Sequence, residues 1–444
     1  MPHAPTDTTL PSLEGRSATD SGAASGHALT IVHSPVRALV SRRFDLGSTL
    51  HFGRVAGADV DVALDDPKLS RRHAIVIRAG IVIEIRDQGS RNGTFVNGAR
   101  IEVAALRPGD IVRIGDTLLE LGDTPARAVT GDPGLIGTAP AFLAAVELVD
   151  RAASSDLPVV ILGETGTGKE LLAHRVHAQS GRKGSFVAVN CAALPHELVE
   201  ATLFGHKKGA FTGATSDNPG LFLEAQGGTL FLDEIGELDV THQAKLLRAL
   251  DSREIIPVGG ARRVHTDARV IAATNIELPA RVADGDFRAD LYARLAGVVV
   301  RMPALRARRG DILPLAEHFL ARPPPAVPLR LSAQAAERLL LHPWPGNVRE
   351  LVLAMRRLGL QLGDRAEVRR ADVDAVVESA VEGTHDTPSR PSGARPGMPT
   401  REQLAAELAE VRGNVSRLAE HYGKHGKQIY RWLKRYRLDP DSFR

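Results

Sequence analysis

An apolar run, residues 157–162, leads into a glycine-rich turn and then into a helix-compatible segment, residues 169–179. Glycines at this spacing let backbone N–H groups curl around phosphate oxygens, and a lysine adds charge at the β- and γ-phosphates. Glu170 departs from the general pattern, which has a Ser or Thr hydroxyl for Mg²⁺ at this position. The turn predicts nucleotide binding, with a glycine-rich turn and a stray lysine as the alternative. The expected nucleotide-binding residues here are Gly163, Glu164, Thr165, Gly166, Thr167, Gly168, Lys169 and Glu170.

Two carboxylates end a second strand-like run, residues 229–234. Asp233 can hold Mg²⁺, and Glu234 can orient or deprotonate an attacking water. A third apolar run ends in Thr274 and Asn275, polar groups that are well placed to sense a γ-phosphate; a turn-forming Asn is the alternative. Together with the lysine of the turn, these residues predict ATP hydrolysis with Mg²⁺ rather than ATP binding alone.

Arg288 and Arg294 lie six residues apart in FRADLYARL, a spacing at which two residues of a helix do not share one face closely. Solvated surface arginines are the alternative for both. After a Pro-Trp-Pro-Gly break we expect a helix that is capped by Asn347 with Glu350 three residues on, and with Arg349 in its first turn.

The segment 204–214, FGHKKGAFTGA, is not required by generic ATP chemistry. Two glycines flank Phe211 and Thr212, which predicts a mobile loop that exposes an aromatic ring. An exposed Phe on such a loop indicates contact with a partner.

Composition and charge bound the class of protein. The 444 residues suffice for about three domains, and the net charge of +3 is small, so any nucleic-acid binding must use a local basic patch. One cysteine, Cys191, excludes an intrachain disulfide and suits a reducing cytoplasm. The sequence contains no apolar span of about 18 residues, and its start lacks the pattern of a signal peptide. We therefore expect a cytoplasmic protein that makes no membrane contact.

Short β-rich runs with Asn-Gly, Pro-Gly and Gly-Asp turns predict an all-β sandwich over residues 28–122, after a flexible tail, residues 1–27. Polar residues gather in three of the breaks, and Arg, Ser and Asn supply the donors that a phosphate needs. The elements GR, SRxH and NGTxxNG resemble those of the forkhead-associated (FHA) family. The resemblance implies a phosphothreonine-peptide site whose loops are braced by His73 and Asn97; simple turn formers are the alternative. The implied peptide-binding residues are Arg54, Ser70, Arg71, Arg91 and Asn92.

The rest of the chain divides by composition. Residues 123–134 are rich in Pro, Gly and Thr and predict a linker. Strand and helix patterns then alternate and predict an α/β domain, residues 135–381, with a helical lid from about residue 312. A second linker, residues 382–400, precedes a small all-α domain, residues 401–444.

The C-terminal domain has a helix-turn-helix pattern. Asn414 caps a short helix, and the second helix turns Ile429 and Leu433 inward and a basic face outward. Such a helix can enter the major groove, with Lys427 and Gln428 nearest the bases; a solvated cationic helix is the alternative. The segment resembles the Fis-type DNA-binding domain. Its first helix has an apolar stripe of Val415, Leu418, Ala419 and Tyr422. The expected DNA contacts are Lys424, Lys427, Gln428, Arg431, Lys434 and Arg435.

The central motifs GETGTGKE, GAFTGA, GGTLFLDEIGEL, IAATN, FRADLYARL and WPGNVREL resemble, in order and spacing, the AAA+ domain of sigma-54-dependent transcriptional activators. Glu170 is what that family usually carries. The resemblance implies that Asn190 holds Glu234 in an inactive pose, and that Arg288 and Arg294 enter a neighbour's ATP site in a homo-oligomeric ring, a hexamer.

The resemblance also implies two sensors of the nucleotide and a contact with sigma-54. Thr274 and Asn275 form the first sensor, and Arg349 is the second. The loop residues implied to contact sigma-54 are Gly209, Ala210, Phe211, Thr212, Gly213 and Ala214.

The sequence thus predicts a regulator that binds enhancer DNA and uses ATP hydrolysis to remodel sigma-54 RNA polymerase to the open complex. Its input comes from a phosphothreonine-containing protein, linked to a Ser/Thr kinase. Two features depart from the family patterns: Leu223 stands where a Glu is usual, and Lys424 with Gly426 alters the C-terminal turn. A non-catalytic DNA-binding scaffold and an AAA+ unfoldase or helicase are the alternatives.

Overall fold

The computed structural model describes residues 27–122, 135–321, 329–363, 365–382, 399, 401–422, 429–430, 432–433, 436 and 438–443. These fall into two compact units, Met1–Ala380 and Val381–Arg444. The expected tail and the two expected linkers lie almost wholly outside the described residues, as do all six expected DNA contacts.

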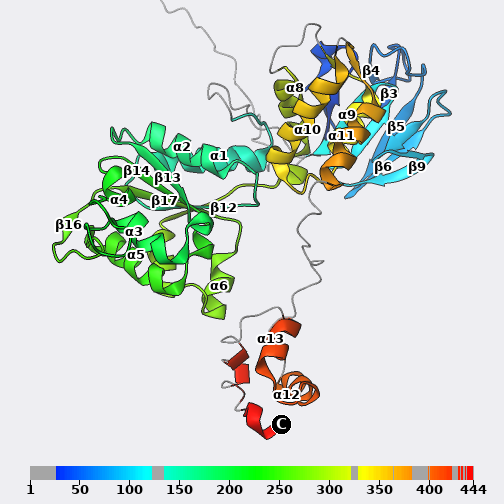
Figure 1. Ribbon diagram of the computed structural model, residues 1–444. Coiled ribbons are helices and arrows are strands. Elements are labelled where there is room, and N and C mark those ends of the chain that lie inside the picture. Colours follow the sequence, from blue (N-terminus) through cyan, green and yellow to red (C-terminus); the bar gives the residue numbers. More distant parts are fainter. Residues whose placement is uncertain are drawn as a thin grey trace, which may run out of the picture. The chain divides into compact units, whose positions relative to one another are not determined.

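The N-terminal domain is the predicted all-β sandwich (Figure 1). One sheet has the order β2-β1-β11-β10-β7-β8, and the other has the order β4-β3-β5-β6-β9. The core between them is apolar and includes Ile31, Phe52 and Ile85. The strands are β1 (Ala28–His33), β2 (Arg43–Asp45), β3 (Thr49–Gly53), β4 (Val62–Ala63), β5 (Ala74–Ala79), β6 (Val82–Asp87), β7 (Thr94–Val96), β8 (Ala99–Ile101), β9 (Val103–Leu106), β10 (Ile111–Ile114) and β11 (Thr117–Gly122); a short 3-10 turn is η1 (Arg37–Leu39).

The central domain is built on a parallel sheet of order β13-β14-β17-β12-β18, confirming the predicted α/β class (Figure 1). Alternate residues of β12 face opposite layers: Val159 packs in the core of α1 and α2, and Val160 packs in the core of α3 and α5–α7. Burial on both faces explains why these strands read as continuous apolar runs. The strands are β12 (Val159–Leu162), β13 (Phe186–Asn190), β14 (Thr229–Asp233), β15 (Glu254–Ile255), β16 (Val264–His265), β17 (Arg269–Thr274) and β18 (Val298–Arg301).

The helices of this domain cover both faces of the sheet. They are α1 (Pro140–Ala153), α2 (Lys169–Gln179), η2 (Cys191–Ala193), η3 (His196–Leu198), α3 (Val199–Phe204), α4 (Leu221–Glu224), η4 (Ile235–Glu237), α5 (Val240–Ser252), α6 (Leu278–Asp284) and α7 (Ala289–Leu295). A helical lid follows the α/β domain. It consists of η5 (Leu305–Ala307), η6 (Arg309–Asp311), α8 (Ile312–Leu320), β19 (Arg330–Leu331), α9 (Ala333–Leu341), α10 (Asn347–Leu362), β20 (Glu367–Val368) and α11 (Arg370–Glu382).

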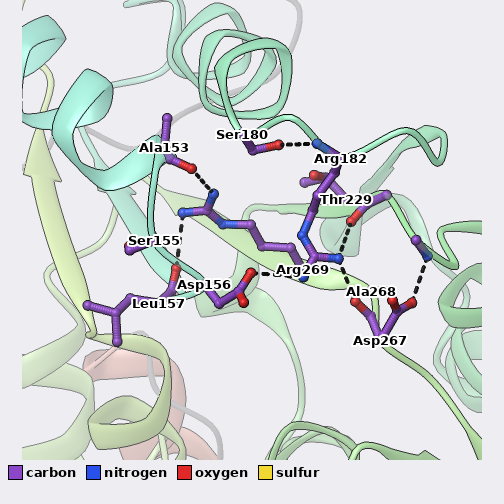
Figure 2. Close-up of polar contacts among 12 residues, drawn as sticks. Ala153, Ser155, Asp156, Leu157, Ser180, Arg182, Thr229, Asp267, Ala268 and Arg269 are labelled. Carbon is purple, nitrogen blue, oxygen red and sulfur yellow. Dashed lines mark hydrogen bonds and ion pairs between the residues drawn. The ribbon is translucent and has the colours of Figure 1, made fainter.

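Two arginines hold the edge of the sheet at which the strands begin (Figure 2). Arg269 is 3% exposed, and its guanidinium donates to the carbonyls of Ala153 at 2.9 Å and Leu157 at 3.3 Å. Arg182 donates to the carbonyl of Asp267 at 2.7 Å and to the Asp156 carboxylate at 2.9 Å. These bonds satisfy carbonyls at the end of α1 and in the loops before β12 and β17, which a buried position requires.

The C-terminal unit contains α12 (Arg401–Glu410), α13 (Val415–Tyr422) and η7 (Pro440–Phe443). Asn414 caps α13 as predicted, because its Oδ1 accepts hydrogen bonds from the backbone N of Ser416 and Arg417. The predicted stripe of α13 is buried, together with Ile429 and Leu433. Within the part of the chain that the structure describes, no helix is both long and apolar enough to cross a membrane.

Candidate nucleotide-binding site

The phosphate-binding turn lies between β12 and α2, as the sequence predicts. Gly166 and Gly168 have left-handed φ angles of 80° and 103°, which glycine adopts without strain. Lys169 begins α2; its side chain is 7% exposed, and its Nζ donates to the Gly163 carbonyl at 2.9 Å. The Thr167 hydroxyl donates to the Glu164 carbonyl at 2.7 Å. The ammonium is therefore held within the turn. From there it can exchange the Gly163 carbonyl for a phosphate oxygen at the N-terminus of α2.

The two carboxylates lie at the adjoining strand end. Asp233 is the last residue of β14. Glu234 follows with a left-handed φ of 52°, which breaks the alternation of side-chain directions along the strand. One Glu234 oxygen lies 3.8 Å from Lys169 Nζ, and the other accepts a hydrogen bond from the backbone N of Asn275 at 3.3 Å. The Asn275 amide donates to the Thr165 hydroxyl at 3.3 Å. The lysine, the carboxylates and the first expected sensor thus converge at the carboxyl edge of the parallel sheet.

Residues of the lid close over the turn. A Cβ on Gly166 would lie 2.2 Å from the Gly346 carbonyl, so glycine is needed for this close approach. Arg349, the expected second sensor, is exposed, and its backbone N donates to the Gly166 carbonyl at 3.3 Å. The structure therefore brings Arg349 to the phosphate-binding turn.

The predicted cap by Asn347 is wrong. The residue before α10 is Gly346, and the Asn347 side chain turns inward: its Oδ1 accepts from the backbone N of Leu305 at 2.8 Å, and its Nδ2 donates to Glu164 and to the Thr165 carbonyl, both at 3.1 Å. Local cap statistics favoured Asn, but a buried amide has better partners in the turn. The feature that sequence reasoning missed is this bridge between the lid and the turn.

Glu164 is also fixed by the lid. Arg306 binds its two carboxylate oxygens at 2.7 and 2.5 Å. This pairing, assisted by the Asn347 amide and opposed by burial, lowers the pKa of Glu164 to about 2. The phosphate-binding turn is therefore held from the lid side by a permanently charged pair.

Several expected residues lie away from this cluster. Glu170 is largely exposed on α2. Asn190 pairs in register with Asp233, but its Oδ1 accepts from the backbone N of Ala192 at 2.9 Å, so the implied inactive pose of Glu234 stays a prediction. Arg288 binds Asp290 through two hydrogen bonds and Arg294 binds Asp251, and both arginines are partly exposed.

The loop that carries Phe211 and Thr212 is closed by its own backbone. Gly209 N donates to the Ala214 carbonyl at 2.8 Å, and Ala214 N donates to the Phe211 carbonyl at 3.0 Å. The Phe211 side chain is exposed at 36%, with its ring centroid 5.0 Å from that of His206. The predicted exposure of this ring is confirmed. Leu223, in α4, packs against the apolar core of the domain, which accounts for a leucine at that position.

The polar loops of the N-terminal sandwich also converge. The Arg54 backbone N donates to the Ser70 carbonyl at 3.0 Å, and the Ser70 hydroxyl accepts from the Arg91 backbone N at 3.0 Å. His73 is buried between the Ser70 N at 3.1 Å and the Gly93 carbonyl at 3.2 Å, which confirms its bracing role; burial lowers its pKa. The side chains of Arg54, Arg71, Arg91 and Asn92 are exposed at these loops.

A Mg²⁺ site fits the residues at the carboxyl edge. Asp233 is partly buried beside the turn and presents a carboxylate, the hard oxygen ligand that Mg²⁺ prefers. A hollow of about 520 Å³ is lined by Glu234, Asn275, Asp239 and His242, and its lining includes neither Asp233 nor the phosphate-binding turn. The edge thus presents the carboxylate donor that a Mg²⁺ ion bound with phosphates requires.

The domains match known families. The sigma-54 interaction domain matches residues 135–301, the FHA domain matches residues 50–115, and the AAA+ ATPase lid domain matches residues 306–389. The structure is similar to that of NtrX from Brucella abortus in complex with ATP, with 34% identity, a TM-score of 0.50 and coverage of 70% of each chain.

Two curated relatives extend the match. The Nif-specific regulatory protein of Rhodobacter capsulatus is 50% identical over 236 residues, which are 52% of this chain and 41% of the relative. The chain therefore spans about two-fifths of the length of that relative. The nitric oxide reductase transcription regulator NorR1 of Cupriavidus necator is 39% identical over 376 residues, which are 77% of this chain and 73% of the relative. From these matches, the chain belongs to the family of sigma-54-dependent transcriptional activators, and it carries an FHA domain and an AAA+ domain with its lid.

Proposed function

We propose that this protein hydrolyses ATP in a ring of identical subunits, a hexamer, and uses the energy to remodel sigma-54 RNA polymerase to the open complex. It binds enhancer DNA through its C-terminal unit and takes its input from a phosphothreonine-containing protein. Its place of action is the cytoplasm, where polymerase and DNA lie. The observation that carries the proposal is the convergence of Lys169, Glu234 and Asn275 at one edge of the sheet.

Each residue of the cluster has a role in hydrolysis. Lys169 leaves the Gly163 carbonyl and binds the β- and γ-phosphates, while backbone N–H groups of the turn bind the remaining oxygens. Glu234 orients the attacking water and accepts its proton. When Mg²⁺ is bound, Asp233 holds it, and the ion neutralises phosphate charge. Asn275, with Thr274 behind it, reports on the γ-phosphate through its bond to Glu234.

The ring is needed to complete the site. Arg288 and Arg294 are partly exposed on their own subunit and pair with acids there, and each can exchange that acid for a phosphate when a neighbour presents a triphosphate. Arg349 contacts the same turn from the lid and senses the nucleotide within the subunit.

The Phe211 loop is the proposed contact with sigma-54. Phe211 and Thr212 are exposed and lie between Gly209 and Gly213, which adopt left-handed φ angles without strain. The decisive experiment measures open-complex formation by sigma-54 polymerase with the purified chain and ATP. Thr212→Ala should abolish open complexes and leave ATP hydrolysis within about twofold, and the nearby exposed Thr215→Ala is the matched control. An unfoldase or helicase would hydrolyse ATP without any dependence on sigma-54.

Phosphothreonine recognition rests on the exposed arginines at the FHA loops. Arg54→Ala should weaken binding of a phosphothreonine peptide by at least about tenfold, because a charge-assisted bond to phosphate is lost. Arg72, which is exposed beside them and pairs with Asp59, supplies the control variant Arg72→Ala. If Arg54→Ala left peptide binding and transcription unchanged, control by a phosphothreonine-containing protein would be refuted. The proposed link to a Ser/Thr kinase would be refuted with it.

A further inference from the structure

The strands β10 and β11 of the FHA sandwich are buried on both faces. Val112 and Leu119 point into the sandwich core, whereas Ile111 and Leu118 are 0% exposed in a core formed by lid helices. Successive residues of a strand face opposite sides, so the outward face of these strands is covered by the lid. Helix α9 provides that cover, with contacts to both strands. The FHA domain thus packs on the ATPase lid of its own chain.

A buried ion pair joins the two domains. Arg113 on β10 donates from Nε to Glu337 on α9 at 2.9 Å, with side-chain exposures of 12% and 4%. The Arg113 guanidinium lies 3.7 Å from the ring centroid of Phe95 on β7. A pair so buried has a fixed geometry, because either charge alone would be costly to leave unpaired.

The FHA contact continues into the segment that precedes α8. Arg309 donates to the Gly109 carbonyl at 2.6 Å. The adjacent Arg308 is 3% exposed and donates to the carbonyl of Thr167 in the phosphate-binding turn at 3.0 Å. Neighbouring residues of one segment therefore touch the FHA domain on one side and the nucleotide site on the other.

The phosphopeptide loops are connected to the same contact from within the sandwich. The loop that carries Arg91 and Asn92 runs directly into β7, where Phe95 stacks on Arg113. The Asn97 side chain, in the turn after β7, accepts from Ile111 N at 3.0 Å and donates to Asp110 at 2.7 Å. One short strand, β7, thus connects the phosphopeptide loop to β10.

We propose that the FHA domain acts as a fixed extension of the lid, so that phosphothreonine binding at its loops changes the affinity of the Lys169 site for nucleotide in the same chain. The Arg113–Glu337 pair and the Arg309–Arg308 step transmit the change. This inference rests on the proposed function, because it takes both the phosphopeptide site and the nucleotide site as given.

The test measures the ADP Kd of the full chain with and without a saturating phosphothreonine peptide that the chain itself selects from a degenerate library. The two Kd values should differ by at least about fivefold, and saturating ADP should change the peptide Kd by the same factor. Arg113→Ala, on the FHA side, and Glu337→Gln, on the lid side, should each bring that ratio towards one while both ligands still bind. Arg86→Ala is the matched control, since Arg86 is half exposed and pairs with Glu84 within the sandwich.

The outcomes distinguish failure of this inference from failure of the proposed function. A ratio of one in the wild-type chain, with both ligands bound, overturns this inference and leaves the proposed function intact. A ratio that survives both Arg113→Ala and Glu337→Gln overturns the route. A wild-type chain that selects no phosphothreonine peptide overturns phosphothreonine input and this inference together.

Discussion

The Asn347 side chain, at the first residue of lid helix α10, donates a 3.1 Å hydrogen bond to the carbonyl of Thr165 in the phosphate-binding turn. The same amide contacts Glu164 at 3.1 Å and accepts from Leu305 N at 2.8 Å. One fully buried side chain thus links the lid to the turn.

Asn347→Asp should separate the lid from the turn. The carboxylate still accepts from Leu305 N, but it loses both donated bonds and faces Glu164, whose low pKa keeps it charged. We expect ADP affinity to fall by about tenfold or more, because buried hydrogen bonds are lost and a repulsive like-charge contact with Glu164 is gained. Isothermal titration with ADP measures this. Gln179→Glu, an equivalent change at the exposed end of α2, should leave the Kd unchanged; equal effects of the two variants would contradict the bridge.

Glu234→Gln should separate binding from hydrolysis. Glutamine keeps the size of the side chain and its acceptor for Asn275 N, but it cannot take a proton from water. We expect the hydrolysis rate to fall by about 10²-fold or more, with ATP affinity within about threefold of wild type. Steady-state phosphate release and nucleotide titration check the two parts. Glu237→Gln, exposed in the adjacent turn, is the control; a chain that loses no activity in Glu234→Gln uses another base.

The phosphate-binding turn and its flanking elements could be predicted from sequence because their signals are local. Glycine spacing, an apolar run and a helix start lie within one short segment, and helix α2 has the predicted bounds. The convergence of Lys169, Glu234 and Asn275 could also be predicted from sequence. Strands that alternate with helices form a parallel sheet, which brings their carboxyl ends to one edge.

The contacts between domains could not be predicted in the same way. Asn347 and Thr165 are 182 residues apart, and the local rule for helix caps gave Asn347 a different role. For the FHA–lid contact the sequence held only a weak signal: Leu118 lies on the strand face opposite Leu119 and Leu121, but it shares that face with Glu120. The partner of that second face, however, depends on distant residues.

Arg269→Met should destabilise the central domain. The variant keeps much of the apolar volume but leaves the carbonyls of Ala153 and Leu157 without their buried donor, and it removes one of the donors to Ala152. We expect the unfolding free energy to fall by about 3 kcal/mol, measured by urea unfolding with ADP absent. Arg263→Met, at a side chain that is 70% exposed, should change it by less than about 0.5 kcal/mol. Similar losses in both variants would show that Arg269 adds no more than a surface charge.

Glu120 should make the FHA–lid contact sensitive to pH. Burial raises the pKa of Glu120 to about 7 from the ordinary 4.5, a rise that Arg309 opposes and Asp311 increases. Because the folded carboxyl holds its proton more tightly than the unfolded one, its contribution is present below about pH 4.5 and is lost as the pH rises through about 7. The contribution of Glu120 to the unfolding free energy that is lost over this pH range is about 3 kcal/mol at most.

Glu120→Gln removes this titration while keeping a neutral side chain of similar shape. The variant should resemble wild type near pH 5 in the stability of β11, measured by hydrogen exchange of its amides, and should be more stable near pH 8 by up to about 3 kcal/mol. Glu102→Gln, at an exposed position of the same domain, should show no such divergence. If the wild type and Glu120→Gln kept a constant difference from pH 5 to pH 8, Glu120 would have to be ionised and solvated throughout that range. The lid would then not cover the outward face of β11 as its buried Leu118 requires.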